Sequence, residues 1–154
     1  MVKDIAVTVS DGTNAIAGAT VTIGDDEETT DEDGKAVFES VYTGTQTVTV
    51  SKAGYATNTS TITVDESHTS FEIALDVVDT ITIVVDDGTN PIEGASVTIG
   101  EVIQTTDASG ECTFTDMVYD DYSAEISAEG YTTKTETLQF RSNHKSFTIS
   151  LATA

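Results

Sequence analysis

The feature that most constrains the fold is an internal duplication. The segment DGTNAIAGATVTIG at residues 11–24 returns as DGTNPIEGASVTIG at residues 87–100, with eleven of fourteen positions identical and a shift of 87 − 11 = 76. Only Val41-Tyr42 aligns better one residue out, with Val118-Tyr119, which indicates a local slip in the register of the repeat. The chain therefore contains two copies of one unit, and we expect two domains, at residues 1–76 and 77–154.

Within each copy, apolar residues alternate with polar ones, most often threonine. The run Ile5–Val9 and its counterpart Ile81–Val85 show the pattern most clearly. A period of two is typical of strands that bury one face and expose the other. Turn residues separate these runs at intervals of roughly 8–12 residues, and no segment keeps a helical spacing over three turns. The sequence predicts an all-β chain with about seven short strands per copy, folded as two antiparallel β-sandwiches.

The repeated segment itself is explained by the demands of shape. DGTN is a turn signal, in which Gly12 and Gly88 can adopt a positive φ without strain. The later motifs TTDEDG and TTDASG indicate a second tight turn, in which Asp31 or Asp107 would accept hydrogen bonds from backbone N–H groups. We therefore expect the repeat to encode a scaffold rather than a catalytic motif.

Charge excludes several classes of partner. The 154 residues carry 27 acidic and 6 basic side chains, for a formal net charge of −21, and both copies share the excess. Nucleic-acid binding depends on lysine and arginine neutralising phosphates, so we expect no nucleic-acid partner and no attraction to anionic membranes. No apolar run reaches the roughly 18 residues that a membrane-spanning helix needs. The first residues also lack the pattern of a secretory signal peptide.

The second-copy motifs DGTNPIEGASVTIG, TTDASGECTF and DDYSAEISAEGY, with their first-copy counterparts, resemble the carboxypeptidase regulatory-like domains. The resemblance covers nearly the whole of both copies and extends to Cna-B modules and bacterial Ig-like modules. The family's Gly-x-Tyr is divided between the copies: the first has Gly44 with Gln46, and the second has Asp120 with Tyr122. The resemblance implies two tandem immunoglobulin-like (prealbumin-like) antiparallel β-sandwiches, and non-catalytic modules of secreted, cell-surface or virion proteins.

No catalytic constellation is expected. Cna-B modules often carry a Lys–Asn crosslink, but Lys3 has no asparagine partner in the last strand, Phe71–Asp76, and the second copy lacks both residues at the equivalent places. His68 and His144 precede the final strand of each copy without further ligands at metal-binding spacing. No nucleophile elbow accompanies the serines. We expect that the chain is not an enzyme and has no intradomain crosslink.

The single cysteine, Cys112, excludes an intrachain disulfide. It stands where the first copy has Ala36, which predicts a small side chain buried in a strand.

Calcium is the small ligand that the sequence most favours, because many carboxylates lie in one hairpin of the first copy. A hard cation with six to eight oxygen ligands suits such a cluster. The second copy makes the same turn with far fewer acids, so the extra carboxylates are not needed for the fold, and a solvated acidic hairpin is the competing explanation. The candidate calcium ligands are Asp25, Asp26, Glu28, Asp31 and Asp33.

Two tyrosines of the second copy are candidate partner-binding residues. Tyr119 and Tyr122 flank two aspartates in VYDDYS, and exposed aromatic rings beside carboxylates can stack on sugars or contact a partner protein. Core packing is the alternative explanation, and it fits Tyr122 better because that residue occupies the family's tyrosine position.

A short connector joins the two copies. We expect Leu75 to end the first sandwich and Thr80 to begin the second, so that the four residues Asp76–Asp79 span at most about 14 Å. The connector has no glycine or proline, which argues against a flexible tether.

From this we predict a structural or adhesive module that forms a stiff acidic rod in an extracellular assembly, as part of a cell-surface protein, a filament subunit or a phage virion protein. Protein partners or self-assembly follow from that role. The alternative is a carbohydrate- or calcium-binding module of a secreted protein. A third hypothesis is strand exchange, in which the terminal strand Met1–Ser10 pairs with a neighbouring subunit. An unpaired first-strand position would support it.

Overall fold

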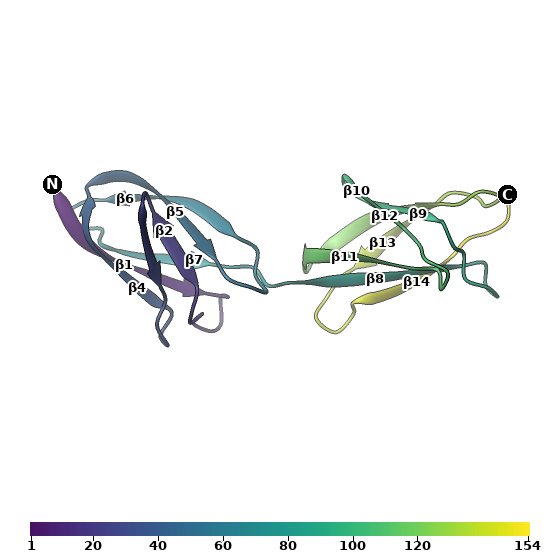
Figure 1. Cartoon of the computed structure of the whole chain (residues 1–154), viewed down its shortest axis with the longest axis horizontal. Helices are drawn as coiled ribbons and strands as arrows, with labels where there is room; N and C mark the ends of the chain where they lie inside the picture. The colour runs from purple at the N-terminus through teal and green to yellow at the C-terminus, as the bar shows by residue number, and fades with distance from the viewer. The chain divides into compact units, whose positions relative to one another are not determined.

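The computed structural model describes the whole chain, Met1–Ala154, which divides into two compact units, Met1–Val77 and Val78–Ala154 (Figure 1). Each unit contains seven β-strands, and the chain has no helix. Consequently there is no helix long and apolar enough to cross a membrane. The predicted all-β class is confirmed.

The strands of the first unit form two sheets. A three-stranded sheet has the order β4-β1-β7, and a four-stranded sheet has the order β3-β2-β5-β6. The bounds are β1 (Val2–Ser10), β2 (Thr20–Ile23), β3 (Asp26–Thr29), β4 (Lys35–Tyr42), β5 (Gly44–Ser51), β6 (Asn58–Val64) and β7 (Ser70–Ala74).

The second unit repeats this topology strand by strand. Its sheets have the orders β11-β8-β14 and β10-β9-β12-β13. The bounds are β8 (Val78–Asp86), β9 (Ser96–Ile99), β10 (Val102–Thr105), β11 (Glu111–Val118), β12 (Asp121–Ser127), β13 (Lys134–Gln139) and β14 (Ser146–Ser150). The predicted tandem immunoglobulin-like β-sandwiches are therefore confirmed.

Each core lies between the two sheets of its unit and is built by the alternation in the sequence. Ile5, Val7 and Val9 of β1 are fully buried, whereas the residues between them are partly exposed. The inward residues of β2, β4 and β5 complete the first core, and an equivalent cluster fills the second unit. Because full burial of one such side chain is worth about 1.5–3 kcal/mol, these inward positions dominate the stability of each unit.

One buried polar residue per unit fastens the loop before the second strand. The hydroxyl of Thr30 donates to the carbonyl of Ile16 at 2.7 Å and accepts the N–H of Ala19 at 2.8 Å. Thr106 makes the same two contacts in the second unit. A buried hydroxyl that satisfies two buried backbone groups avoids the cost of leaving them unpaired, which accounts for the repeated TTD motif.

The two predicted turns carry aspartates that accept backbone hydrogen bonds. Asp11 accepts the N–H groups of Thr13 and Asn14, and Asp87 does the same in the second unit. These N–H groups, above all that of Asn14, hold the pKa of Asp11 below its ordinary value. The DGTN repeat is a turn, as the sequence predicts.

The first and last strands of each unit pair in parallel, and every other strand pair is antiparallel. Strand β7 lies beside β1 from Ala6↔Ser70 to Ser10↔Ala74, and β14 lies beside β8 in the same way. The first and last strands of each unit are the farthest apart in its sequence, and this pairing brings them into direct contact. The alternation of apolar and polar residues predicts a strand but does not indicate which other strand it pairs with.

Three expectations from the sequence need correction. The predicted slip at Val41-Tyr42 is absent, because Val41 pairs with Lys3 as Met117 pairs with Asp79, so the shift of 76 persists through this strand. The predicted connector is too long, because β8 already begins at Val78. Finally, strand β1 occupies the first-strand position of its own unit, between β4 and β7, so the open position required for strand exchange is filled.

Candidate functional site

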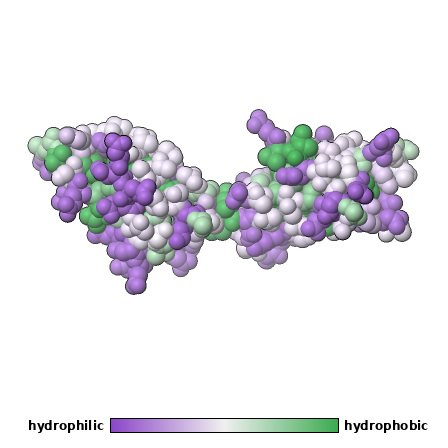
Figure 2. All heavy atoms as spheres, in the orientation of Figure 1, coloured by the Kyte–Doolittle hydropathy of each residue, from purple (hydrophilic) through white to green (hydrophobic).

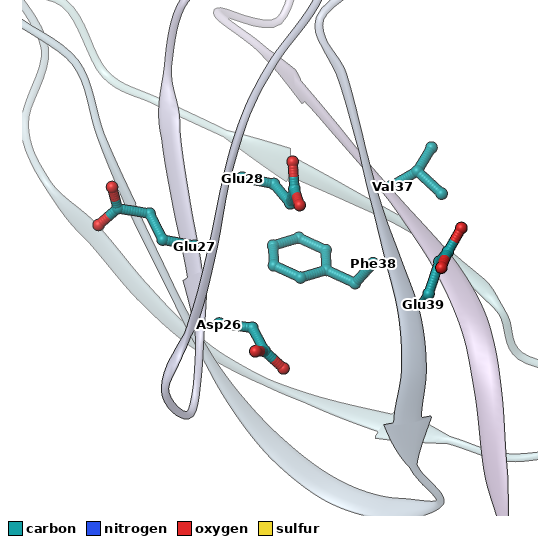
Figure 3. Close-up of a pocket in the computed structure, with 6 residues that line it drawn as sticks. All are labelled: Asp26, Glu27, Glu28, Val37, Phe38 and Glu39. Atoms are coloured by element: carbon teal, nitrogen blue, oxygen red, sulfur yellow. The ribbon is translucent and has the colours of Figure 1, made fainter.

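The acidic hairpin of the first unit consists of β2 and β3, and it places its carboxylates on both faces of the sheet edge. Asp26 pairs with Ile23 and Glu28 pairs with Val21, so both acids share the face of these two buried residues. Figure 3 shows Asp26 and Glu28 pointing toward the ring of Phe38, with Glu27 on the opposite side of the strand. This edge therefore carries negative charge above and below the sheet.

A groove lies between the edge strands β3 and β4, beside these acids. It has a volume of about 350 Å³ and is lined by Asp26, Glu27, Glu28, Val37, Phe38 and Glu39 (Figure 3). The carboxylates of Asp26 and Glu28 beside the Phe38 ring give it a negative potential over an apolar surface, and none of its lining residues is basic. Such a groove could accept a cationic group, whereas an anion would be repelled.

The five predicted calcium ligands occupy different parts of this hairpin and of the turn after it. Asp31 caps the turn, because its carboxylate accepts the N–H groups of Asp33 and Lys35 at 3.0 and 2.9 Å. Asp107 makes the same contacts in the second unit, which identifies Asp31 as a turn residue. No group of three or more His, Cys, Asp or Glu side chains is arranged to hold a metal ion in this structure. Calcium binding at Asp25, Asp26, Glu28, Asp31 and Asp33 stays a prediction.

The equivalent edge of the second unit has the opposite character. Strand β10 has the sequence VIQT where β3 has DEET, so the three consecutive acids of the first unit are replaced by Val102, Ile103 and Gln104. Val102 is 51% exposed and Ile103 is 64% exposed. Sequence reasoning missed this edge, although the aligned copies carry the signal: charged in one and apolar in the other at the same three positions.

The candidate tyrosines pack inside the second unit. The ring of Tyr119 lies 5.0 Å from that of Phe140 and the ring of Tyr122 lies 6.4 Å from it, measured between centroids. The hydroxyl of Tyr122 donates to the carbonyl of Val118, and the hydroxyl of Tyr119 donates to a carboxylate oxygen of Asp79, both at 2.8 Å. Both side chains are only partly exposed. Their geometry is that of an aromatic cluster at the margin of the core, and partner binding stays a prediction.

Asp79 also forms an ion pair with Lys145, so three polar groups converge at the start of β8. The Lys145 ammonium, followed by the N–H of Thr80 and the hydroxyl of Tyr119, lowers the pKa of Asp79 to about 2. The carboxylate in turn raises the pKa of Lys145. The carboxylate of Asp79 and the ammonium group of Lys145 are thus both held in their charged forms. An amide crosslink between these two side chains would instead require a neutral amine and an electrophilic carboxyl group. The arrangement is an ion pair suited to holding β8 against the loop before β14.

The remaining chemically notable residues have structural surroundings. His68 contacts the carboxylate of Asp65, which lowers the pKa of Asp65 to about 2. His144 lies against Phe147, with ring centroids 4.4 Å apart. Cys112 is buried in β11, and its burial, followed by the charges of Asp107 and Glu111, raises the pKa of the thiol to about 11. A thiol with that pKa is protonated at neutral pH and therefore a poor nucleophile.

Comparison with protein families finds one match, which lies in the first unit. Residues 4–76 match the family model of the carboxypeptidase regulatory-like domain. This confirms the resemblance drawn from the sequence, and it covers almost all of the first unit. The second unit, which repeats the topology of this regulatory-like domain, lies outside the matched range.

Three solved structures illustrate what this chain is similar to. A streptococcal ancillary pilin has a TM-score of 0.52 at 14% identity, with 100% of this chain and 63% of that one covered. The Bacillus anthracis TIE protein has a TM-score of 0.47 at 19% identity, with 99% and 34% covered. The shaft pilin SpaA from Lactobacillus rhamnosus GG has a TM-score of 0.47 at 13% identity, with 100% and 98% covered.

The chain thus spans about a third of the TIE protein and under two thirds of the ancillary pilin. At 14% identity, the likeness to the ancillary pilin concerns the fold alone. No curated protein sequence matches the chain.

Proposed function

We propose that this chain is a non-catalytic structural module of an extracellular assembly, in which two sandwiches act as a stiff, acidic, tension-bearing spacer. The observation that carries the proposal is the parallel pairing of the first and last strands in each unit. In a parallel pair, the start of one strand and the end of the other lie at opposite ends. The chain therefore enters each unit at one end of its three-stranded sheet and leaves at the other.

This geometry determines how tension acts on the unit. A pull on the two ends slides β1 along β7, so all five residue pairs from Ala6↔Ser70 to Ser10↔Ala74 are loaded together. Two more backbone bonds extend the pair, from Ala6 to the carbonyl of Thr69 and from Leu75 to that of Ser10, both at 2.8 Å. Bonds that must break simultaneously resist a force better than bonds that are peeled apart one by one.

The residues between Leu75 and Thr80 belong to one unit or the other. The N–H of Ala56 donates to the carbonyl of Asp76 at 2.8 Å, and Tyr55 forms a β-bridge with Val77. The next residue, Val78, already belongs to β8. Asp76 and Val77 thus make backbone contacts within the first unit, and Val78 belongs to a strand of the second.

The setting of this module is also part of the proposal. A streptococcal protein of the same fold is an ancillary pilin, which favours the cell surface and a filament over a virion. The net charge of −21 suits a molecule kept soluble and apart from its copies at high surface density. The two domains are proposed to fold independently, one from each copy of the repeat.

Single-molecule force spectroscopy tests the proposal. Pulled from its two ends, the chain should unfold in two events, at forces several-fold above those of a peeling geometry. The peeling control is the full chain with Tyr42→Cys, pulled between its N-terminus and that thiol, because Val2 and Tyr42 are paired neighbours at one end of the sheet. Both proteins carry Cys112→Ala, so that no second thiol is present. Equal unfolding forces in the two geometries would refute a load-bearing role.

The alternative function, calcium or carbohydrate binding, is separable by thermal stability. A ligand that binds only the folded state raises Tm with its concentration. If millimolar calcium raises the Tm of the wild type but not that of the double variant Asp26→Asn, Glu28→Gln, an ion-binding function at the acidic groove would replace the structural proposal. The corresponding carbohydrate test compares wild type with Tyr119→Phe and Tyr122→Phe.

A further inference from the structure

Strand β10 is an exposed edge of the four-stranded sheet of the second unit, paired with β9 on one side only. Its sequence VIQT contains no charge, and Val102 and Ile103 place exposed apolar side chains on opposite faces of the strand. Figure 2 shows the hydrophobic patch over β10. Uncharged edges with apolar side chains are templates for another strand, and most proteins guard them with charge, proline or bulges.

The backbone of β10 has hydrogen-bonding groups directed away from the sheet. Just beyond the strand, Thr106 donates its N–H to Ala95 and accepts from Gly94, both at 2.9 Å, so its backbone groups face β9. Because this direction alternates along a strand, Val102 and Gln104 also face β9, whereas Ile103 and Thr105 face outward. A second strand can therefore bond to Ile103 and Thr105.

We propose that the occupant of this edge is a second copy of the chain, with β10 paired antiparallel to β10. Such a pair has a twofold axis perpendicular to the sheet, and the outer face of one sheet then continues into the outer face of the other. Residues opposite each other must lie on the same face, so the axis passes midway between one residue and the same residue of the second copy. The two registers that keep this short strand paired are centred on Ile103 and on Gln104.

Charge selects between these registers. Centred on Gln104, the pairing would bring Glu101 opposite Asp107 of the second copy, which is destabilising for like charges. Centred on Ile103, it brings Glu101 opposite Thr105 and Val102 opposite Gln104. Ile103 then lies against Ile103 of the second copy, where the two residues can exchange both backbone hydrogen bonds. The register centred on Ile103 is therefore the one that forms.

The first unit shows why the pairing is specific to the second. The same register in β3 would place Glu27 opposite Glu27 and Asp26 opposite Glu28, so that each of these central pairs would join two carboxylates. Charges that point inward from an edge strand are a recognised defence against such pairing. Of the two equivalent edges in each chain, only β10 is competent, and a chain with one self-complementary edge forms closed pairs rather than filaments.

The pair is weak by itself, because a four-residue strand buries less than the roughly 1,000 Å² typical of a stable interface. The net charge of −21 on each copy opposes it further. Such a contact becomes effective where copies are held close together, since a high local concentration replaces intrinsic affinity. The second copy would thus be a partner in the proposed assembly, and the biological role of the pairing rests on that proposed function. The pairing itself can be tested in solution.

The experiment measures the mass of the chain by sedimentation and light scattering from about 10 μM to about 1 mM, at about 0.15 M and about 0.5 M NaCl. We expect the average mass to rise toward twice that of the chain, and to rise further at the higher salt, which screens the repulsion. Ile103→Glu, which copies the residue of the first unit, should weaken dimerisation at least about tenfold. Ile103→Val, the conservative control, should retain it.

Amide hydrogen exchange locates the contact. The amides of Ile103 and Thr105 should gain protection as concentration rises, whereas those of Glu27 and Thr29 in the first unit should not change. A monomer at every concentration and salt, or a dimer that persists in Ile103→Glu, would overturn the proposal. Neither result would affect the unfolding forces that test the load-bearing role, so the two proposals can fail separately.

Discussion

Strands β3 and β10 occupy the same position in two copies of one fold, yet one carries three consecutive acids and the other two exposed apolar residues. Both hairpins have the same register, Ile23↔Asp26 in the first unit and Ile99↔Val102 in the second. The difference shows that the fold tolerates either chemistry at this edge, because neither edge strand contributes a buried residue. Such a position is free to acquire a function in one copy while the other stays guarded.

A second difference lies in the cores. Phe140 of the second unit stands where the first unit has Val64, and both side chains are buried. Around Phe140 the second unit adds Tyr119 and Tyr122, where the first has Thr43 and Gln46. The two copies thus have the same strand topology, but one margin of the core contains aromatic side chains in the second unit only. Four predictions examine how far this equivalence extends.

The largest effect is expected in the core. Phe140→Ala should destabilise the second unit by about 3–5 kcal/mol, since it removes a fully buried ring and the contacts of two tyrosines. Val64→Ala should cost the first unit only about 2 kcal/mol. Denaturant unfolding measures both, with amide exchange to assign each loss to its unit. Equal losses would show that the aromatic cluster adds no stability.

The next effect concerns a turn that should be equivalent in both copies. Gly34 and Gly110 both have φ +73°, and a methyl group at either would overlap the carbonyl oxygen of Val9 or Val85. Alanine should cost about 3 kcal/mol at each position, from backbone strain and the overlap combined. Gly12→Ala is the control, because its φ is also positive but its surroundings are open, and it should cost about 1 kcal/mol. Unequal losses at Gly34 and Gly110 would break the equivalence.

Transplanting the apolar edge should extend the self-association. A variant that carries Asp26→Val, Glu27→Ile and Glu28→Gln gives the first unit the strand VIQT, so that each chain has two competent edges. We expect species larger than dimers in light scattering, because two self-complementary edges per chain permit open assembly. The control adds Ile103→Glu to the same chain and should return it to dimers. A transplanted chain no larger than wild type would show that edge chemistry alone does not decide the pairing.

The smallest effect is a pH dependence. Because Lys145 lowers the pKa of Asp79 to about 2 from 3.8, the folded carboxylate binds protons less readily than the unfolded one. This contribution to stability is present above about pH 4 and is lost as the pH falls toward 2. Asp65, lowered to about 2 by His68, gives the first unit the same acid window.

Thermal unfolding between pH 2 and pH 7 measures this contribution. Asp79→Asn should reduce the loss of Tm at acid pH in the second unit alone, and Asp65→Asn should do the same in the first unit alone. If both units lose Tm over the same acid range and neither variant changes that loss, the effect does not originate at these two carboxylates.

Much of the fold follows from the sequence, because alternation and turn chemistry are local properties. The strands around Ile5–Val9 and Ile81–Val85 were predictable from their period of two, and the turn at DGTN from its residues. The parallel pairing of β1 with β7 was not, since residues 64 positions apart (70 − 6) come together only when the sheets close. The candidate site follows the same division: the acids of the hairpin are visible in the sequence, whereas the position of Asp26 and Glu28 beside Phe38 depends on how two sheets face each other.

The sequence by itself determined that this protein is a duplicated, acidic, all-β chain whose first copy matches the regulatory-like domain, because repetition, charge and period are local properties of the residues. Only the tertiary structure decided that β3 and β10 are edges and that the ends of each unit are drawn into one parallel pair. It also brought Tyr119 and Lys145 together on Asp79. The physical reason is common to all three. Whether a strand is an edge, which strands share hydrogen bonds, and which side chains meet are properties of the closed sheets, in which each strand's neighbours come from distant parts of the chain.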